Sequence, residues 1–326
     1  MLNNQIINKK ILIFGGSGSL GHALIDRYIE NNIIVNYSRD ECKHWQMALK
    51  YKSDKLRFVI GDVRNYNRVE STIMRENPNI IIIACALKHI DMCEYAVEEC
   101  MATNYMGTVN IVNAVERNMI VLSNLTHVIF ISTDKACSPV NTYGMAKSLS
   151  EKIIIEKSLN IKGIVFACTR YGNVLTSRGS IIPILHNKAM DPECKEFVLT
   201  HVDMTRFIMT LDESVDLIEY TILNAESGDI VIPKLLAMYI KDLLELFSEK
   251  YGKPIRITQL KPGEKLAESL INESQAMSMV IGEKYYHIKP YYKNLCDITQ
   301  ATDYNSKMNT LNKSELQDYL GRLALL

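Results

Sequence analysis

Proton-transfer chemistry is concentrated in one stretch of the sequence, STDKACSPVNTYGMAK at residues 132–147. Tyr143 and Lys147 are four positions apart, so a helix predicted over residues 143–157 places them on one face. A neighbouring ammonium favours the charged form of a phenol, and we therefore expect Lys147 to lower the pKa of Tyr143. The phenolate could then accept a proton from a hydroxyl group. Ordinary surface pairs share this spacing, so the surrounding sequence has to decide between the two interpretations.

A predicted strand places this stretch at the edge of a sheet. The β-branched apolar run THVIF, residues 126–130, ends just before Ser132 and Thr133. In open α/β sheets, ligands bind at the carboxyl ends of the strands. Repeated strand–helix alternation without a hairpin signal predicts an α/β fold with a doubly wound parallel sheet.

A glycine-rich turn follows the first predicted strand, within KILIFGGSGSLGHALIDRYIE at residues 10–30. Gly15, Gly18 and Gly21 form the pattern G-x-x-G-x-x-G, and an amphipathic helix begins there. Such a turn lets a pyrophosphate approach the backbone while the helix N-terminus supplies amide donors. The strand before it and the helix after it predict a dinucleotide site.

The next two predicted strands indicate which dinucleotide binds. The strand at residues 33–38 ends in Ser38-Arg39 rather than in the acidic residue that would accept hydrogen bonds from an NAD ribose. A guanidinium can bind a 2′-phosphate, so Arg39 favours NADP, although a solvated loop arginine with acidic neighbours is the alternative. Asp62, at the end of the strand over residues 56–63, could accept a hydrogen bond from the adenine amine.

Further basic residues follow the fourth strand and continue into the C-terminal half. Lys88 comes directly after the strand at residues 80–86, either near the cofactor ribose and the substrate or simply exposed. His89 has no metal partner at a useful spacing, so we interpret it as packing or surface. Arg178, Arg206, Lys261 and Lys265 occupy loop-like settings suited to a diphosphate.

The domain boundaries follow from the change of pattern after Asn173. We expect a dinucleotide-binding Rossmann domain over residues 8–172, to which residues 207–232 return. Residues 173–326 should form mainly a smaller substrate-binding region and a C-terminal tail. The segment from about residue 291 carries no pattern to which we can assign a function.

The composition narrows the class of protein. The 326 residues include 37 basic and 37 acidic side chains, so no net field attracts nucleic acid or an acidic membrane. No apolar run approaches the roughly 20 residues of a membrane span, and the N-terminus lacks a signal-peptide core, which predicts a soluble cytoplasmic protein. Eight cysteines without a C-x-x-C pair argue against zinc and disulfides, so we expect no metal.

With these pieces in place, the sequence resembles the extended short-chain dehydrogenase/reductase superfamily, and within it the 5-inverting UDP-N-acetylglucosamine 4,6-dehydratases. The resemblance covers residues 10–271 and rests on ten segments in the family's order: GGSGSLG, SRDE, GDVR, ALKH, STDKA, YGMAK, RYGNV, SRGS, MTRF and KPGEK. Three positions depart from the family pattern: Phe14 replaces a Thr, Lys261 an Arg, and Ala267 a His. Lys261 keeps the charge but loses the bidentate geometry of an arginine.

The resemblance implies roles for individual residues. Catalytic residues are expected at Thr133, Asp134, Lys135, Tyr143 and Lys147. Cofactor contacts are expected at Gly15, Ser17, Gly18, Ser19, Leu20, Gly21, Ser38, Arg39, Asp62, Val63, Ala84, Tyr143 and Lys147. Substrate contacts are expected at Lys88, Asn173, Arg178, Arg206, Lys261 and Glu264.

The implied reaction begins with oxidation at C4, for which Tyr143 takes the proton of the 4-hydroxyl. Lys135 is expected to remove the C5 proton and Asp134 to protonate the departing 6-hydroxyl. Hydride return to C6 and inversion at C5 would give UDP-2-acetamido-2,6-dideoxy-β-L-arabino-hexos-4-ulose, as the first step of a glycan pathway. NADP would stay tightly bound and be recycled.

Alternatives remain at this point. A nucleotide-sugar 4-epimerase or a C5-retaining 4,6-dehydratase would use the same fold, and so would a non-catalytic NADP-binding regulator. The adjacent Asp134 and Lys135 favour elimination over epimerisation. The resemblance also implies a homo-oligomer, a dimer or a hexamer, although no periodic stretch identifies an interface.

Overall fold

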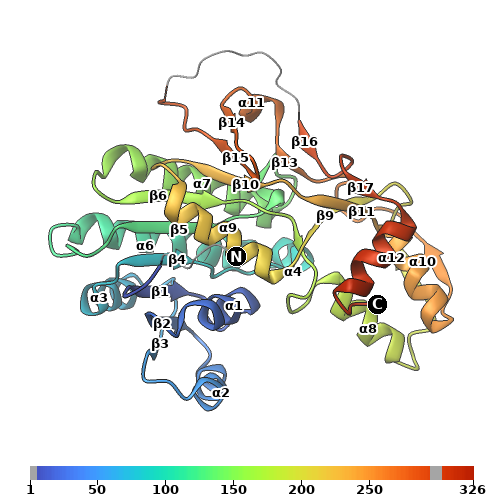
Figure 1. Cartoon of the computed structure of the whole chain (residues 1–326), viewed down its shortest axis with the longest axis horizontal. Coiled ribbons are helices and arrows are strands. Elements are labelled where there is room, and N and C mark those ends of the chain that lie inside the picture. Colours follow the sequence, from blue (N-terminus) through green and yellow to red (C-terminus); the bar gives the residue numbers. More distant parts are fainter. Residues whose placement is uncertain (1–5, 294–302) are drawn as a thin grey trace.

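The computed structural model describes residues 6–293 and 303–326, and an α/β architecture dominates it (Figure 1). Within these ranges the main sheet has nine strands in the order β14-β15-β10-β6-β5-β4-β1-β2-β3. Its strands are β1 (Lys10–Phe14), β2 (Ile33–Ser38), β3 (Leu56–Ile60), β4 (Ile80–Ile83), β5 (His127–Ile131), β6 (Val165–Thr169), β10 (Ile230–Pro233), β14 (Met279–Ile281) and β15 (Tyr285–Ile288).

In this sheet, the neighbouring strands β3, β2, β1, β4, β5, β6 and β10 are paired in parallel. The strands β15 and β14 add an antiparallel edge beside β10. The large parallel sheet confirms the predicted fold class. The antiparallel edge was not predicted, since its short strands lie in the segment whose sequence carried no clear pattern.

Helices cover both faces of the main sheet. The longer ones are α1 (Ser19–Tyr28), α2 (Glu41–Tyr51), α3 (Tyr66–Glu76), α6 (Gly107–Asn118), α7 (Thr142–Asn160) and α9 (Leu211–Asn224). The short ones are α4 (Ile90–Tyr95), α5 (Val97–Cys100), the π-helix η1 (Met101–Met106) and the 3₁₀ helix η2 (Asp134–Ala136). Packing contacts join α1 to α9 and join α3 and α7 to α6.

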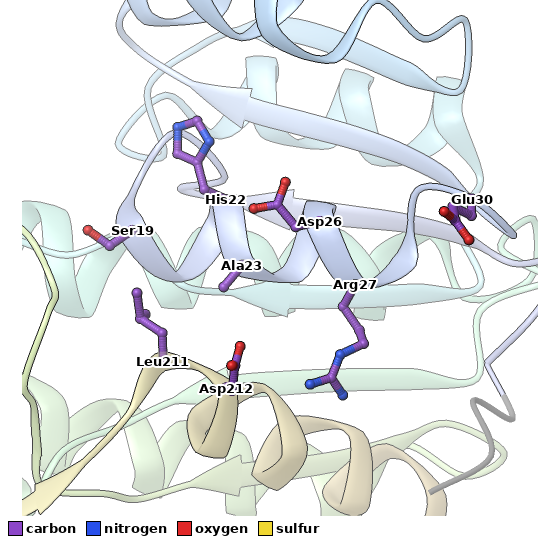
Figure 2. A pocket seen from close by; sticks show the side chains of 8 residues that line it. All are labelled: Ser19, His22, Ala23, Asp26, Arg27, Glu30, Leu211 and Asp212. Atoms are coloured by element: carbon purple, nitrogen blue, oxygen red, sulfur yellow. The ribbon is translucent and has the colours of Figure 1, made fainter. Parts of the chain in front are cut away.

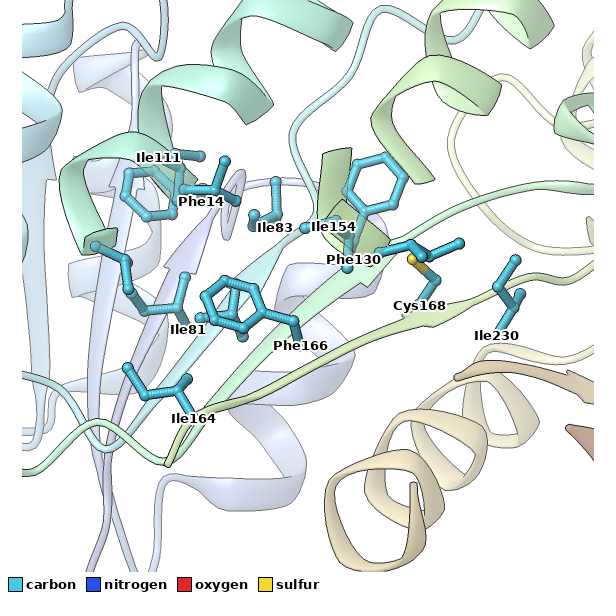
Figure 3. Packing of buried hydrophobic residues seen from close by; sticks show 14 of the residues in the cluster. Phe14, Ile81, Ile83, Ile111, Phe130, Ile154, Ile164, Phe166, Cys168 and Ile230 are labelled. Carbon is cyan, nitrogen blue, oxygen red and sulfur yellow. The ribbon is translucent and has the colours of Figure 1, made fainter. Parts of the chain in front are cut away.

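Side-chain alternation along β1 explains why both faces are covered. Leu12 and Phe14 belong to the apolar cluster packed under α3, α6 and α7, part of which Figure 3 shows. Ile11 and Ile13 point the other way, into the cluster beneath α1 and α9. Because successive strand residues face opposite sides, a continuous apolar run of this kind belongs to a strand buried on both faces.

A second layer of smaller elements lies beyond the carboxyl end of β6, with α8, α10 and α12 grouped at one end of the molecule (Figure 1). One sheet contains β7 (Asn173–Val174), β9 (Thr205–Met209), β11 (Leu236–Tyr239) and β17 (Thr310–Leu311). Two strand pairs are β8 (Phe197–Leu199) with β12 (Ile255–Ile257), and β13 (Ser269–Ile271) with β16 (Tyr304–Asn305). The helices are α8 (Ile181–Met190), α10 (Ile240–Tyr251), α11 (Glu273–Ala276) and α12 (Lys313–Arg322).

Ser306, just after β16, ties distant parts of this layer together. Its hydroxyl lies 2.8 Å from that of Thr205 and accepts a hydrogen bond of 3.0 Å from the backbone N–H of Glu268. Its own N–H donates to the Glu268 carbonyl at 2.8 Å. A segment near the end of the chain therefore fixes the backbone of Glu268.

Two predicted elements differ from the observed ones. The strand predicted over residues 56–63 ends at Ile60. Just before α6, both polar atoms of the Asn104 side chain, within the π-helix η1, bind the backbone of Leu87. Isolated π-turns are frequent at functional sites, and this one holds the segment that carries Lys88. The strand predicted over residues 80–86 ends at Ile83, where the chain turns past Gly15.

Two further observations concern the described residues as a whole. No helix in them combines the length and the apolar character that a membrane crossing requires. Over the same ranges, no group of three or more His, Cys, Asp or Glu side chains is arranged to hold a metal ion. Cys296 and part of the segment to which no function was assigned lie outside them.

Candidate functional site

The start of α7 brings Tyr143 and Lys147 beside the carboxyl end of β5. Asn141 caps the helix by accepting a hydrogen bond from the Gly144 N–H at 2.8 Å. Lys147 is buried, donates to the Ile131 carbonyl at 2.5 Å and lies over the Phe130 ring, 4.2 Å from its centroid. The pair is therefore part of the interior and not a surface pair.

Burial changes the expected proton affinities of this pair. It raises the pKa of Tyr143 above its ordinary value, and a hydrogen bond with Thr133 opposes the increase only in part. Burial also lowers the pKa of Lys147 to about 8. The prediction that Lys147 lowers the pKa of Tyr143 is thus wrong for the protein alone, because burial of the phenol raises this pKa and the charge of Asp134 adds to the increase.

Thr133, Asp134 and Lys135 form a connected polar group at the end of β5. The Thr133 hydroxyl donates to Asp134 Oδ1 at 2.9 Å, and Lys135 Nζ donates to the same oxygen at 3.0 Å. Asp134 is completely buried, and its Oδ2 atom contacts no hydrogen-bond partner in the described part of the chain. An unpaired buried oxygen is costly, which is typical of a site where a further group binds.

Glu268, which the sequence did not single out, extends this group. It is buried, with Oε1 4.0 Å from Lys135 Nζ and Oε2 3.4 Å from Lys265 Nζ. Lys265 also donates to the Cys137 carbonyl at 2.9 Å. The turn that carries Lys265 is therefore joined directly to the stretch at residues 132–147.

A buried ion pair anchors β5, α7 and β6 to the smaller layer. Arg170 donates to Glu151 through Nε at 2.9 Å and Nη2 at 2.5 Å, and Ser132 donates to Glu151 at 2.6 Å. The third guanidinium nitrogen donates to the Leu270 carbonyl and to Gln275, each at 2.8 Å. Sequence reasoning missed this network, since its members lie far apart along the chain.

The glycine-rich turn is shaped by close backbone contact. Gly15 has φ +92°, and a Cβ there would lie 2.7 Å from the Cys85 nitrogen and 2.9 Å from the Ala84 carbonyl carbon. In the described chain Gly18 caps α1 without a side-chain hydrogen bond, and the first turn of α1 contains no acidic residue. Ser17, Ser19, Leu20 and Gly21 complete this turn. The tight backbone of this turn and the N-terminal dipole of α1 suit a pyrophosphate.

Phe14, the first departure from the family pattern, causes no conflict. It is buried in β1 and packs against Tyr37, with ring centroids 4.8 Å apart.

The ends of β2 and β3 lie next to each other. Arg39 keeps 53% of its side chain exposed and lies 3.8 Å from Asp62. Asp62 is bound more closely by Arg64, at 2.6 Å, and is followed by the buried Val63. An exposed guanidinium thus follows Ser38, and β2 ends in a hydroxyl side chain rather than a carboxylate.

Lys88 and Arg178 meet over the glycine-rich turn. Lys88 Nζ donates to the Arg178 carbonyl, while burial, followed by the charge of Arg178, lowers the Lys88 pKa. The Arg178 guanidinium donates to the Ser17 carbonyl, and its backbone N–H donates to Ser19 Oγ at 3.0 Å. The structure therefore places Arg178, together with Lys88, at the turn expected to hold the cofactor.

The remaining expected substrate contacts surround the KPGEK turn. Arg206 Nη1 donates to the Thr205 and Lys265 carbonyls at 2.7 and 3.0 Å, so this residue supports the turn. Lys261 is exposed and lies 3.3 Å from Asp91. Glu264 accepts from the Lys261 N–H at 3.1 Å.

Asn141 connects this turn to α7, and Asn173 begins β7. The Asn141 amide donates to the Gly263 carbonyl at 2.9 Å. The Asn173 Oδ1 atom is buried, and no hydrogen bond reaches it from the described residues. The KPGEK turn is thus joined to the stretch at residues 132–147, and Asn173 belongs to the four-stranded sheet of the smaller layer.

A separate groove of about 530 Å³ lies between α1 and the start of α9, as Figure 2 shows. Its lining consists of Ser19, His22, Ala23, Asp26, Arg27, Glu30, Leu211 and Asp212. None of the predicted catalytic residues lines it, so we do not place the chemistry there.

Comparison with known proteins identifies the family. The family model described as "Polysaccharide biosynthesis protein" matches residues 11–290. A curated relative named UDP-glucose 4-epimerase, from Rickettsia rickettsii, is 37% identical over 87% of this chain and 84% of its own length.

Solved structures agree on the fold. Pen from Bacillus thuringiensis superimposes with a TM-score of 0.90 at 28% identity, covering 99% of this chain and 100% of that one. DesIV, a dTDP-glucose 4,6-dehydratase from Streptomyces venezuelae with NAD and TYD bound, gives a TM-score of 0.67 at 16% identity over 79% and 86% of the two chains. The last comparison supports the fold alone. Given the extent of the family match and the identity to the curated relative, the chain belongs to the polysaccharide biosynthesis protein family.

Proposed function

We propose that this protein is a nucleotide-sugar 4,6-dehydratase that acts on UDP-N-acetylglucosamine with inversion at C5. The observation that carries the proposal is the pair of the buried Asp134 and the half-buried Lys135 beside Tyr143, with 3.0 Å between Lys135 Nζ and Asp134 Oδ1. Oxidation at C4 alone needs only the tyrosine. Eliminating water across C5 and C6 needs a base and an acid in addition, and this pair supplies both.

The residues present fit a nicotinamide dinucleotide, which we propose to be NADP. The close contact of Gly15 with Ala84 and Cys85 makes a cradle that any side chain would fill. Ser38 and the exposed Arg39 would bind the 2′-phosphate, and Asp62 the adenine. When bound, the nicotinamide supplies a hydride acceptor for C4 oxidation and the donor that returns the hydride to C6.

Tyr143 would act at the sugar 4-hydroxyl. Its raised pKa keeps the phenol protonated in the protein alone, so it becomes a useful base only when a positive charge approaches. Lys147 lies one helical turn away and has a pKa of about 8, which lets it give up or hold a proton near neutral pH. Thr133 links the group for C4 oxidation to the group for elimination, because it hydrogen-bonds both to Tyr143 and to Asp134.

Asp134 and Lys135 would divide the elimination between them. For this step Lys135 would be a neutral amine that takes the C5 proton, and Asp134 a carboxylic acid that gives its proton to the 6-hydroxyl, which leaves as water. After hydride return to C6, a proton from solvent would reach C5 on the opposite face. Because Lys135 Nζ and Asp134 Oδ1 are in hydrogen-bond contact, the proton gained by one can pass to the other and restore the pair. Behind Lys135, the Glu268 carboxylate lies 4.0 Å from Lys135 Nζ and 3.4 Å from Lys265 Nζ.

The substrate diphosphate would lie between the catalytic stretch and the KPGEK turn. Lys88 and Lys261 supply positive charge, and Asn173 supplies a buried amide oxygen for a sugar hydroxyl. Arg206 and Glu264 would act mainly by shaping the turn, given their backbone contacts. The division of the chain near residue 172 would then place cofactor contacts on one side and most substrate contacts on the other.

A nucleotide-sugar 4-epimerase is the second candidate, favoured by the printed name of the curated relative at 37% identity. An epimerase would use Tyr143 and the dinucleotide in the same way but would keep the 6-hydroxyl. The Asp134–Lys135 pair would then have no chemical task. A C5-retaining dehydratase and a non-catalytic regulator lack a specific supporting observation of this kind.

The test is incubation of the purified protein with UDP-N-acetylglucosamine in deuterated water, without added cofactor, followed by proton NMR of the sugar. A 4-keto-6-deoxy product with L-arabino configuration and deuterium at C5 is expected. A product that retains its 6-hydroxyl and is altered only at C4 would replace the dehydratase with the epimerase. A 6-deoxy product with D-configuration at C5 would refute the proposed inversion and leave the dehydratase assignment in place.

Three related expectations remain proposals. Self-association as a dimer or hexamer is supported by the exposed apolar side chains of Met92, Tyr95, Met145 and Leu149, on the packed helices α4 and α7. A cytoplasmic location and a place at the start of a glycan pathway rest on the sequence and the family.

A further inference from the structure

A histidine on α2 reaches the residue that ends β2. His44 Nε2 lies 2.5 Å from Ser38 Oγ, and the imidazole packs against Phe58 with ring centroids 5.1 Å apart. His44 is only 4% exposed. Its second nitrogen, Nδ1, is buried and has no hydrogen-bond partner among residues 6–293 and 303–326. The ring therefore makes its single polar contact with Ser38.

The unpaired nitrogen identifies the tautomer. Burial lowers the pKa of His44, and the opposing charges of Asp40 and Glu41 do not reverse this, so the ring is neutral and carries one N–H. If that hydrogen were on Nδ1, a buried N–H would have no acceptor, which is uncommon in folded proteins. With the hydrogen on Nε2, the only N–H of the ring is hydrogen-bonded to Ser38. The contact is therefore a hydrogen bond that His44 donates to Ser38 Oγ.

The direction of this bond decides what Ser38 can offer to a ligand. A hydroxyl has one hydrogen and two lone pairs. Because His44 occupies a lone pair of Oγ, the Ser38 hydrogen stays available to a second partner. A phosphate oxygen only accepts hydrogen bonds, so it requires that hydrogen. A ribose hydroxyl can donate or accept, and it would bind Ser38 in either orientation.

We propose that His44 is a specificity-determining residue, which selects a 2′-phosphorylated dinucleotide by holding the Ser38 hydroxyl in its donating orientation beside Arg39. The inference rests on the proposed function, since Ser38 and Arg39 are assigned there to the 2′-phosphate. His44 acts through Ser38 and touches no ligand itself.

The binding test compares NADP with NAD on the purified, cofactor-free protein by isothermal titration calorimetry. His44→Phe keeps an aromatic ring against Phe58 but has no donor, and it should weaken NADP roughly 10-fold while changing NAD less than about 2-fold. His44→Gln, whose amide can donate, should restore most of the NADP affinity. If His44 acts through Ser38, the double variant S38A/H44F should bind NADP no more weakly than S38A.

A structural readout tests the same inference without any ligand. In protein labelled with ¹⁵N-histidine, His44 should show the Nε2–H tautomer, and H44Q identifies its signals by their loss. An Nδ1–H tautomer would overturn the proposal, as would equal losses of NADP and NAD affinity in H44F. If H44F fails to fold, the tautomer of the wild type and the affinity of H44Q still decide the matter.

The outcome also separates this inference from the function on which it rests. If S38A and Arg39→Ala both leave the preference between NADP and NAD unchanged, the NADP assignment fails. If those variants lose NADP affinity selectively and H44F does not, the assignment stands and the role of His44 is refuted.

Discussion

Arg170 and Glu151 allow a quantitative test of how the site is held together. Both side chains are almost completely inaccessible to solvent, and the guanidinium uses three nitrogens to reach Glu151, the Leu270 carbonyl and Gln275. Replacing Arg170 with Met leaves a buried carboxylate whose only remaining hydrogen-bond donor in the described chain is Ser132. Breaking a buried pair on one side typically costs about 3–5 kcal/mol of unfolding free energy.

Replacing both Arg170 and Glu151 should lower the free energy of unfolding by less than the sum of the two single losses. R170M should lose about 3–5 kcal/mol, and Glu151→Leu alone a similar amount, because each leaves an uncompensated charge. The double variant removes both charges and should be no less stable than either single variant. The coupling free energy between the two sites, which is the sum of the two single losses minus the loss in the double variant, would then be at least about 3 kcal/mol.

Urea unfolding at pH 7, followed by circular dichroism, measures these differences. The matched control is Lys50→Met, which breaks an exposed ion pair with Asp26 and should cost less than about 1 kcal/mol. The reasoning fails if R170M loses no more stability than the control, or if the losses of the two single variants simply add in the double variant.

Three further predictions concern the chemistry and the pH dependence. Lys135→Ala should abolish release of the C5 hydrogen to solvent while leaving dinucleotide binding within about 2-fold, and normal C5 exchange in that variant would remove Lys135 as the base. Gly15→Ala should lose dinucleotide binding, because a Cβ would lie 2.7 Å from the Cys85 nitrogen at φ +92°; unchanged affinity in calorimetry would contradict the proposed cradle. The third prediction uses Lys147, whose pKa is about 8 in the folded protein against 10.5 ordinarily. Between these values the unfolded chain binds more protons, so wild-type stability should rise relative to Lys147→Met by up to about 1.4 kcal/mol per pH unit as pH increases from 8. Parallel curves for the two proteins would show that Lys147 stays charged.

Local sequence patterns were enough to predict the core of the fold. The apolar run of β1, the glycines after it and the helix start that follows are contiguous in sequence, and each has a specific physical signature. The same holds for the THVIF strand and the i, i+4 pair on α7. These features confirm an α/β protein with a large parallel sheet.

Features that depend on tertiary contacts could not be predicted. Glu151 and Arg170 are 19 positions apart, and Arg170 reaches Leu270 across 100 positions, so no local pattern announces the network. The pKa of Tyr143 was predicted in the wrong direction because the sequence shows the nearby charge but not the degree of burial. Arg178 was grouped with other loop arginines, although its loop folds back onto Ser17. A signal for His44 existed only in its spacing from Ser38, six positions earlier.

The contacts of Ser306 have a consequence for the order of folding. Its bond to Thr205 spans 101 positions and its bond to Glu268 spans 38, so both form by closing long loops. Contacts of high sequence separation form slowly because long loops have to close, and the 101 positions of the Thr205 bond exceed the 69 between the paired Ile11 and Ile80 of the main sheet. The segment around Glu268, whose side chain lies 4.0 Å from Lys135 Nζ, should therefore reach its final position late in folding. During refolding, helical and sheet signals should return before the protein regains the ability to exchange the C5 hydrogen.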